Sequence, residues 1–326
     1  MGMFRTLLAA LVLAIGAPVA AQPGPAVSPT EVEIGDALPY AFFAKPEGDG
    51  PFPALILLGG SEGGDGSARR FASAFLEQGY AVLGLPYYSP AYFGRPQQLP
   101  GLPKAFDALP LDNLETARNW LRGREDVRSA AIGIYGVSKG AEMALAGASR
   151  IDGFAAVAAI VPSDVIWEGW GPETKPGEPS SFSWRGEALP FVPYLGMEAE
   201  FAKYADPVAT VRLRTPQDAG RRANPDRVPN ARIRVEDIDE PVLVAGGDAD
   251  NTWNSGLMAQ NIAERRAEAS DLETVAMIFP DAGHALSGTG KQLTEGTFRY
   301  SEANLAAQRK IWPATLEFFA EHLKRE

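Results

Sequence analysis

An excess of acidic side chains, 41 against 30 basic ones in 326 residues, gives the chain a net charge of −11. This charge argues against nucleic acid or an anionic membrane surface as the main partner. With no cysteine and two histidines, the sequence excludes disulfides, thiolate metal sites and a cysteine nucleophile, and it predicts neither a metal site nor a cofactor. A hydrophobic content of 45% is enough for a sizeable core.

The first 21 residues have the pattern of an export signal. Arg5 supplies the positive start, residues 7–15 the apolar core, and residues 19–21 (Val-Ala-Ala) a cleavage site of small residues. The apolar core is short for a membrane span, so a retained anchor is the weaker alternative. We therefore expect a periplasmic or secreted protein without a membrane span after signal cleavage, in which residues 22–50 form a lead-in.

From residue 51 onward, apolar runs alternate with helical patterns. Residues 31–43 alternate weakly and predict edge strands, and the runs typical of buried strands are 53–58, 80–85, 130–135, 155–161, 241–245 and 275–279. Helices are predicted around Phe71 and Phe75 and over 111–121, 141–148 and 304–323, where Pro313 implies a kink or a late start. This alternation predicts an α/β fold over residues 51–326, a doubly wound, mostly parallel sheet with helices on both faces.

Residues 163–234 interrupt this alternation and show no clear period. We expect them to form a cap inserted over the carboxyl ends of the strands, because an insert of this length is usually functional. Its three tryptophans, Trp167, Trp170 and Trp184, are candidate substrate-binding residues. Seven arginines lie between residues 212 and 234. They either form a basic rim that attracts an anionic substrate or, as we favour, pair with surface acids and hold the cap in place.

The motif Gly-Val-Ser-Lys-Gly (136–140) connects the strand predicted at 130–135 to the helix predicted at 141–148. Strand, G-x-S-x-G and helix in this order are typical of a nucleophile elbow, and a glycine-rich turn of any doubly wound sheet is the alternative. Gly136 and Gly140 lack a β-carbon, which lets the two backbones approach closely around Ser138. The helix N-terminus then points at the charge that develops beside the Ser138 hydroxyl.

A serine nucleophile requires a base and a carboxylate that orients it. His284 directly follows the last predicted strand and is the candidate base, whereas His322 lies on the terminal helix and is expected to be a surface residue. The carboxylate follows the strand at 241–245, where Asp248 and Asp250 are both possible. We favour Asp250 because Gly247 leaves the loop room to bend toward the histidine. Serine, acid and histidine then follow in the order that an α/β-hydrolase requires.

An oxyanion hole requires two backbone donors. The amide of Lys139, directly after the serine, and the amide of Ser61, in the glycine-rich loop after the strand at 53–58, are the candidates. The side chain of Lys139 is expected to be a solvated or ion-paired surface group rather than a catalytic one. For the side chain of Glu62 the same two roles, a surface group or a catalytic group, remain open.

Five motifs together resemble the catalytic domain of the acyl-CoA thioesterase and bile acid-CoA:amino acid N-acyltransferase (BAAT) family, within the α/β-hydrolases. The resemblance covers about residues 50–323 and is carried by residues 109–115, 136–142, 182–193, 250–255 and 282–284. It implies a triad of Ser138, Asp250 and His284 and favours Asp250 over Asp248. Family members that act on acyl-CoA inside cells commonly carry an N-terminal β-sandwich, for which residues 22–50 are too few.

These observations predict a serine hydrolase that cleaves carboxylic esters or thioesters through an acyl-enzyme. The resemblance implies hydrolysis rather than transfer, because the amino-acid-transferring members use cysteine where this chain has Ser138. The expected partner is a small-molecule acyl ester or thioester. The alternatives are an acyltransferase, in which another nucleophile replaces water, and a non-catalytic binding protein with the same fold.

Overall fold

The computed structural model describes residues 34, 37–91, 96–206, 208–269, 272–293 and 299–325. The expected export signal and residues 22–33, 35 and 36 of the lead-in lie outside these residues. Among the helices that the structure describes, none combines the length and the apolar character that crossing a membrane requires.

A seven-stranded sheet forms the centre of the molecule, with the strand order β1-β3-β2-β5-β6-β9-β10. Only the pairing of β1 with β3 is antiparallel, and the other neighbours are parallel. The strands are β1 (Phe42–Ala44), β2 (Phe52–Leu58), β3 (Ala81–Gly84), β5 (Val127–Val137), β6 (Ala156–Ile160), β9 (Val242–Gly247) and β10 (Thr274–Phe279). The predicted mostly parallel sheet is confirmed.

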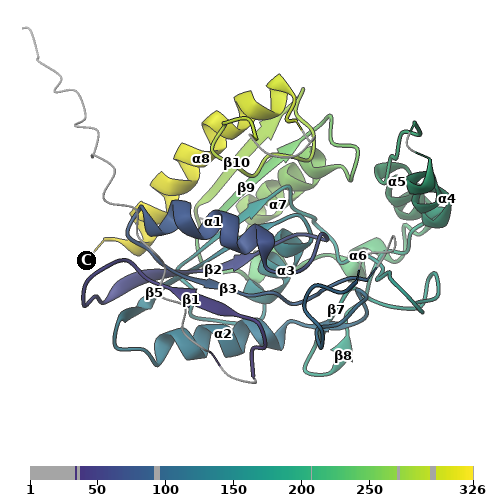
Figure 1. Cartoon of the computed structure of the whole chain (residues 1–326). Coiled ribbons are helices and arrows are strands. Elements are labelled where there is room, and N and C mark those ends of the chain that lie inside the picture. Colours follow the sequence, from purple (N-terminus) through teal and green to yellow (C-terminus); the bar gives the residue numbers. More distant parts are fainter. Residues whose placement is uncertain are drawn as a thin grey trace, which may run out of the picture.

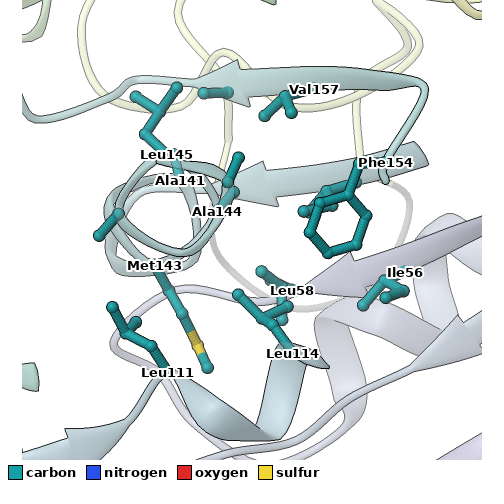
Figure 2. Packing of buried hydrophobic residues seen from close by; sticks show 14 of the residues in the cluster. Ile56, Leu58, Leu111, Leu114, Ala141, Met143, Ala144, Leu145, Phe154 and Val157 are labelled. Carbon is teal, nitrogen blue, oxygen red and sulfur yellow. The ribbon is translucent and has the colours of Figure 1, made fainter. Parts of the chain in front are cut away.

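Helices cover both faces of this sheet (Figure 1). On one face lie α2 (Asp112–Arg122), α3 (Lys139–Ala148) and α7 (Ser255–Ala269), and on the other lie α1 (Gly66–Leu76) and α8 (Glu302–Leu323). Strand β2 serves both layers because successive side chains point to opposite faces. Ile56 and Leu58 meet side chains of α2 and α3 (Figure 2), whereas Leu55 and Leu57 pack on the side of α1 and α8.

The order of the strands creates a crevice at one edge of the sheet. From β2 the chain passes through α1 to β3 on one side, and from β5 it passes through α3 to β6 on the other side. The connections that leave β2 and β5 therefore diverge, and open α/β sheets bind ligands at such a switch point. Ser61 follows β2 and Ser138 follows β5, so both lie at this crevice.

Two details differ from the sequence-based expectation. Strand β10 is only half-buried, because it is the last strand of the sheet and pairs with β9 alone. Helix α8 does not start near Pro313, which was one of the two alternatives. It begins at Glu302, and Pro313 lies inside it. The Ser301 hydroxyl accepts a hydrogen bond from the amide of Asn304 and caps this helix.

The cap expected at 163–234 contains short elements instead of one regular layer. They are β7 (Phe182–Trp184), β8 (Glu187–Ala188), α4 (Met197–Ala202), α5 (Arg214–Ala223) and α6 (Val228–Ala231). Elements of two to ten residues explain why the sequence shows no clear period there. Helices α4 and α5 stand to one side of the main layers (Figure 1). Strand β7 pairs in parallel with β4 (Leu109–Pro110), which ties the cap to the segment before α2.

Candidate active site

The turn between β5 and α3 has the backbone of a nucleophile elbow. Ser138 adopts φ 57° and ψ −121°, a conformation that residues other than glycine rarely occupy. A β-carbon on Gly136 would lie 2.3 Å from the carbonyl oxygen of Gly140, and one on Gly140 would lie 2.3 Å from the carbonyl oxygen of Gly59. Only glycine fits at either position, as the sequence argument requires.

His284 connects the serine to a buried carboxylate. Its Nε2 lies 2.9 Å from Ser138 Oγ, and its Nδ1 lies 2.7 Å from Oδ2 of Asp250. Asp250 is fully buried, whereas Asp248 is exposed. The structure thus brings Ser138, His284 and Asp250 together, and Asp248 is not hydrogen-bonded to the imidazole in any described contact. Such a series of hydrogen bonds can remove a proton from the serine and return it to a leaving group.

The remaining hydrogen bonds of Asp250 fix its orientation. Its Oδ1 accepts from the amides of Thr252 at 2.8 Å and Trp253 at 3.3 Å, and its Oδ2 accepts from Ser255 Oγ at 2.6 Å. The indole of Trp253 meets the ring of His284 edge to face at 5.6 Å. The sequence reasoning missed the roles of Ser255 and Trp253, although both belong to the motif at 250–255.

The candidate oxyanion donors lie on either side of Ser138. Lys139 is the first residue of α3, so its amide belongs to the positive end of the helix dipole. A β-carbon on Gly60 would lie 3.1 Å from Cβ of Ser138, which places the loop after β2 directly against the elbow. Ser61 and Lys139 both line the cavity beside Ser138. The Gly60 amide donates to Oε1 of Glu62 at 3.0 Å, so this carboxylate folds back onto its own loop.

The side chain of Lys139 is ion-paired as expected, but it is not on the surface. It is 3% exposed, and its Nζ lies 2.7 Å from Oε2 of Glu142 and 2.8 Å from Oγ of Ser181. The rings of Phe106 and Phe182 each lie 5.2 Å from the ammonium. Burial lowers the pKa of Lys139 and raises the pKa of Glu142, while the attraction between the two charges opposes both shifts.

A cavity of about 940 Å³ opens beside Ser138 and His284, between the main domain and the cap. Of the three tryptophans expected to bind substrate, only Trp170 lines it. Trp167 is 2% exposed and stacks on Tyr194 at 5.6 Å, so it belongs to the core of the cap. Trp184 packs under the guanidinium of Arg185 at 4.4 Å. The expectation is wrong for these two because Trp167 packs in a buried cluster of the cap with Val165 and Val192, and Trp184 at the end of β7 packs with Arg185.

The described contacts of the cap arginines favour a structural role. None of the seven is among the described residues that line the cavity. Arg221 pairs with the buried Asp164, which also accepts a hydrogen bond from Asn261 of α7. Arg214 donates to carbonyls of the loop that carries Asp250. Arg214 thus bonds the cap directly to the main domain, whereas Arg221 pairs within the cap with Asp164, which Asn261 ties to the main domain.

His322 differs from the expected surface residue. It is half-buried on α8, with its ring 4.9 Å from the ring of Phe318 and its Nε2 3.3 Å from Oε2 of Glu273. Through its contacts with Phe318 and Glu273, His322 contributes to the packing of α8.

Comparison with known sequences identifies the family. The profile of the family described as "BAAT / Acyl-CoA thioester hydrolase C terminal" matches residues 109–288, more than half of the chain. The chain belongs to this family. The match begins at β4 and ends just beyond His284, so it includes the elbow, the cap and the loop of Asp250.

Individual BAAT-family relatives have two kinds of activity in their names. Acyl-coenzyme A thioesterase 1 of Rattus norvegicus is 29% identical over 86% of this chain and 62% of its own length. Acyl-coenzyme A amino acid N-acyltransferase 2 of the same organism is 28% identical over 92% of this chain and 67% of its own length. The chain spans about six tenths of the length of the thioesterases 1 and 2 that it matches.

Solved structures resemble this BAAT-family chain in fold. An α/β-hydrolase enzyme from a deep-sea metagenome library has a TM-score of 0.55 at 13% identity and covers 91% of this chain and 98% of its own. An esterase of Pyrococcus furiosus has a TM-score of 0.52 at 16% identity, with 87% of each chain covered. The fold is therefore that of an α/β-hydrolase, as predicted.

Proposed function

We propose that this protein is a serine hydrolase of acyl esters or thioesters, with Ser138 as nucleophile, His284 as general base and Asp250 as the group that orients and stabilises the imidazole. The continuous hydrogen bonds from Ser138 through His284 to Asp250 carry this proposal. The family relationship to acyl-CoA thioesterases supports the substrate class. Apolar side chains of the cavity, among them Phe71, Trp170 and Phe201, suit an acyl chain.

The reaction has two steps. Ser138 Oγ attacks the acyl carbonyl while His284 Nε2 takes its proton, and the tetrahedral oxyanion accepts hydrogen bonds from the amides of Lys139 and Ser61. The carbon–sulfur or carbon–oxygen bond then breaks, and the thiol or alcohol leaves with the proton from His284. Water, deprotonated by His284, then attacks the acyl carbonyl. The bond between the acyl carbon and Ser138 Oγ breaks, His284 returns the proton to Oγ, and the carboxylic acid is released.

Substitution of the serine tests the mechanism. Ser138→Ala should lower kcat by roughly 10³-fold or more because it removes the nucleophile, while the melting temperature stays nearly constant. Hydrolysis should be measured on p-nitrophenyl esters and acyl-CoA thioesters with matched acyl chains. A fluorophosphonate should label wild type at Ser138 and leave the variant unlabelled. If Ser138→Ala keeps more than about a tenth of the wild-type activity, the assignment is wrong.

Acyl transfer is a second candidate function, favoured by the relationship to the amino acid N-acyltransferase. In that reaction an amine, rather than water, attacks the acyl-enzyme. Addition of glycine or taurine to the thioesterase assay distinguishes the two. Hydrolysis yields free acid alone, whereas transfer yields an N-acyl amino acid or N-acyltaurine that mass spectrometry detects.

We also propose that the protein is exported. The support is the pattern of residues 1–21, in which Arg5 and a short apolar core precede Val-Ala-Ala at 19–21. Signal cleavage after Ala21 should leave a mature protein that begins at Gln22 in the periplasm or the medium. Mass spectrometry of each cell fraction checks this, and an intact N-terminus on cytoplasmic protein would refute it.

A further inference from the structure

Helix α5 of the cap is hydrogen-bonded to the loop at residues 248–252, which we call the acid loop because it carries Asp250. The amide of Arg214 donates to the carbonyl oxygen of Asn251 at 2.9 Å. Nη1 of Arg214 donates to the carbonyl oxygens of Asp248 at 2.8 Å and Asp250 at 3.2 Å. Nε2 of Gln217 donates to the carbonyl oxygen of Thr252 at 3.0 Å. Four carbonyls of the acid loop thus accept hydrogen bonds from two residues of α5.

These contacts complement those of the Asp250 side chain. The carboxylate is held from within the main domain, by the amides of its own loop and by Ser255 of α7. The backbone of the acid loop is held from both sides. The amides of Asp248 and Ala249 donate to the carbonyl oxygens of Phe279 and Ala282 in the main domain, and the carbonyls of the loop accept from the cap. The bonds from Arg214 to Asp250 and from Gln217 to Thr252 are partly buried, and a partly buried carbonyl needs a donor, which here the cap provides. The position of the acid loop therefore depends on α5 as well as on β9.

The same part of α5 also faces the cavity. Gln217 is 4% exposed and lines the cavity together with its neighbour Leu213. Thr252, whose carbonyl oxygen accepts from Gln217, lines the cavity as well. One turn of α5 thus contacts both the space for the substrate and the loop of the candidate catalytic acid.

We propose that Arg214 and Gln217 are positioning residues that hold the acid loop so that Oδ2 of Asp250 meets Nδ1 of His284. This inference rests on the proposed function. The cap then contributes to the chemical step and not only to the walls of the cavity. Without the hydrogen bonds from Arg214 and Gln217, the acid loop can relax toward solvent. A displacement of about 1 Å at a catalytic group is enough to lower turnover about 100-fold.

The test compares Arg214→Ala, Gln217→Ala and their double variant with wild type. We expect kcat to fall about 10-fold to 100-fold in the double variant, while KM changes less than about threefold. Arg214→Lys should recover part of the loss, because an ammonium can still donate to one of the carbonyls. Arg222→Ala is the matched control, since Arg222 is exposed on the same helix, and it should keep wild-type kinetics.

Each outcome decides between a positioning role and a merely structural one. If α5 only anchors the cap, the variants should lower the melting temperature or raise KM with kcat unchanged. A kcat within about twofold of wild type in the double variant overturns the proposal. Should the double variant fail to fold, the two single variants decide by the same criterion. Fluorophosphonate labelling of wild-type Ser138 separates this result from a failure of the proposed function, which would leave wild type unlabelled.

Discussion

Asp248 and Asp250 lie two positions apart in one loop, yet their surroundings are opposite. Asp250 shares its two carboxylate oxygens among two amides, the hydroxyl of Ser255 and the imidazole of His284. Asp248 is exposed and lies beside Gly256 at the start of α7. A negative charge beside Nδ1 holds the imidazole in the tautomer that accepts the serine proton. Only Asp250 is in a position to do this.

Exchange of each aspartate for asparagine should therefore give different results. Asp250→Asn should lower kcat by roughly 10²–10⁴-fold, because the imidazole loses the charge that orients and stabilises it. Asp248→Asn should have a far smaller effect. Steady-state hydrolysis of one ester by both variants, with circular dichroism as a control for folding, measures the difference. If Asp248→Asn is the more damaging change, the assignment of the carboxylate is wrong.

Helix α3 joins the elbow to the cap through the buried pair of Lys139 and Glu142. Besides their ion pair, Lys139 donates to Ser181 of the cap, and Oε1 of Glu142 accepts from the amide of Trp167 at 3.1 Å. The pair, which begins with the residue directly after Ser138, is thereby bonded to two separate cap segments, through Lys139 to Ser181 and through Glu142 to Trp167. Both charges are removed from water, so loss of one partner leaves the other uncompensated.

Lys139→Met should therefore destabilise the protein strongly. We expect the free energy of unfolding to fall by about 3–5 kcal/mol, because the variant leaves the carboxylate of Glu142 buried without its counter-charge. The exposed pair of Lys175 and Glu178 in the same cap offers a control, since Lys175→Met should cost less than about 1 kcal/mol. Urea unfolding at neutral pH compares the two variants. Equal losses would contradict the importance of the buried pair.

Across the whole molecule, buried tyrosines couple stability to alkaline pH. Burial raises the pKa of Tyr80, Tyr87 and Tyr135 above the ordinary value. In the unfolded chain these phenols ionise near pH 10, about their normal pKa, whereas in the folded protein they keep their protons. The folded state then binds more protons than the unfolded state above pH 10. Its stability must fall as the pH rises through that range.

We expect the free energy of unfolding to decrease above pH 10 by about 1.4 kcal/mol per pH unit for each of these tyrosines. Urea titrations between pH 8 and pH 11 give the slope. Tyr80→Phe is a mild control, because the Tyr80 hydroxyl has no hydrogen-bond partner among the described residues. This variant should reduce the slope by the share of one tyrosine, about 1.4 kcal/mol per pH unit. Phenolate absorbance that titrates completely near pH 10 in folded protein would contradict the prediction.

The elbow, His284 and Asp250 could be predicted from the sequence because each depends on a short motif next to a recognisable strand. Glycines at 136 and 140 identify the close approach of strand and helix without any knowledge of the rest of the fold. The burial of Lys139 and Trp167 could not be predicted in this way. It results from cap segments that are far away in the sequence and too short to show a period. The roles of Arg214 and Gln217 depend on the same long-range packing.

The pairing of β4 with β7 determines which part of the protein can be exchanged as a unit. Backbone bonds join Phe106, Ala108, Leu109 and Leu111 to cap residues between 170 and 183. In a chimaera that replaces only residues 163–234, residues 106–111 would pair with cap segments from another protein. The buried charge of Lys139 would also contact side chains from that other protein. Recombination between family members should therefore keep residues 106–111, both charges of the Lys139–Glu142 pair and the cap from a single parent.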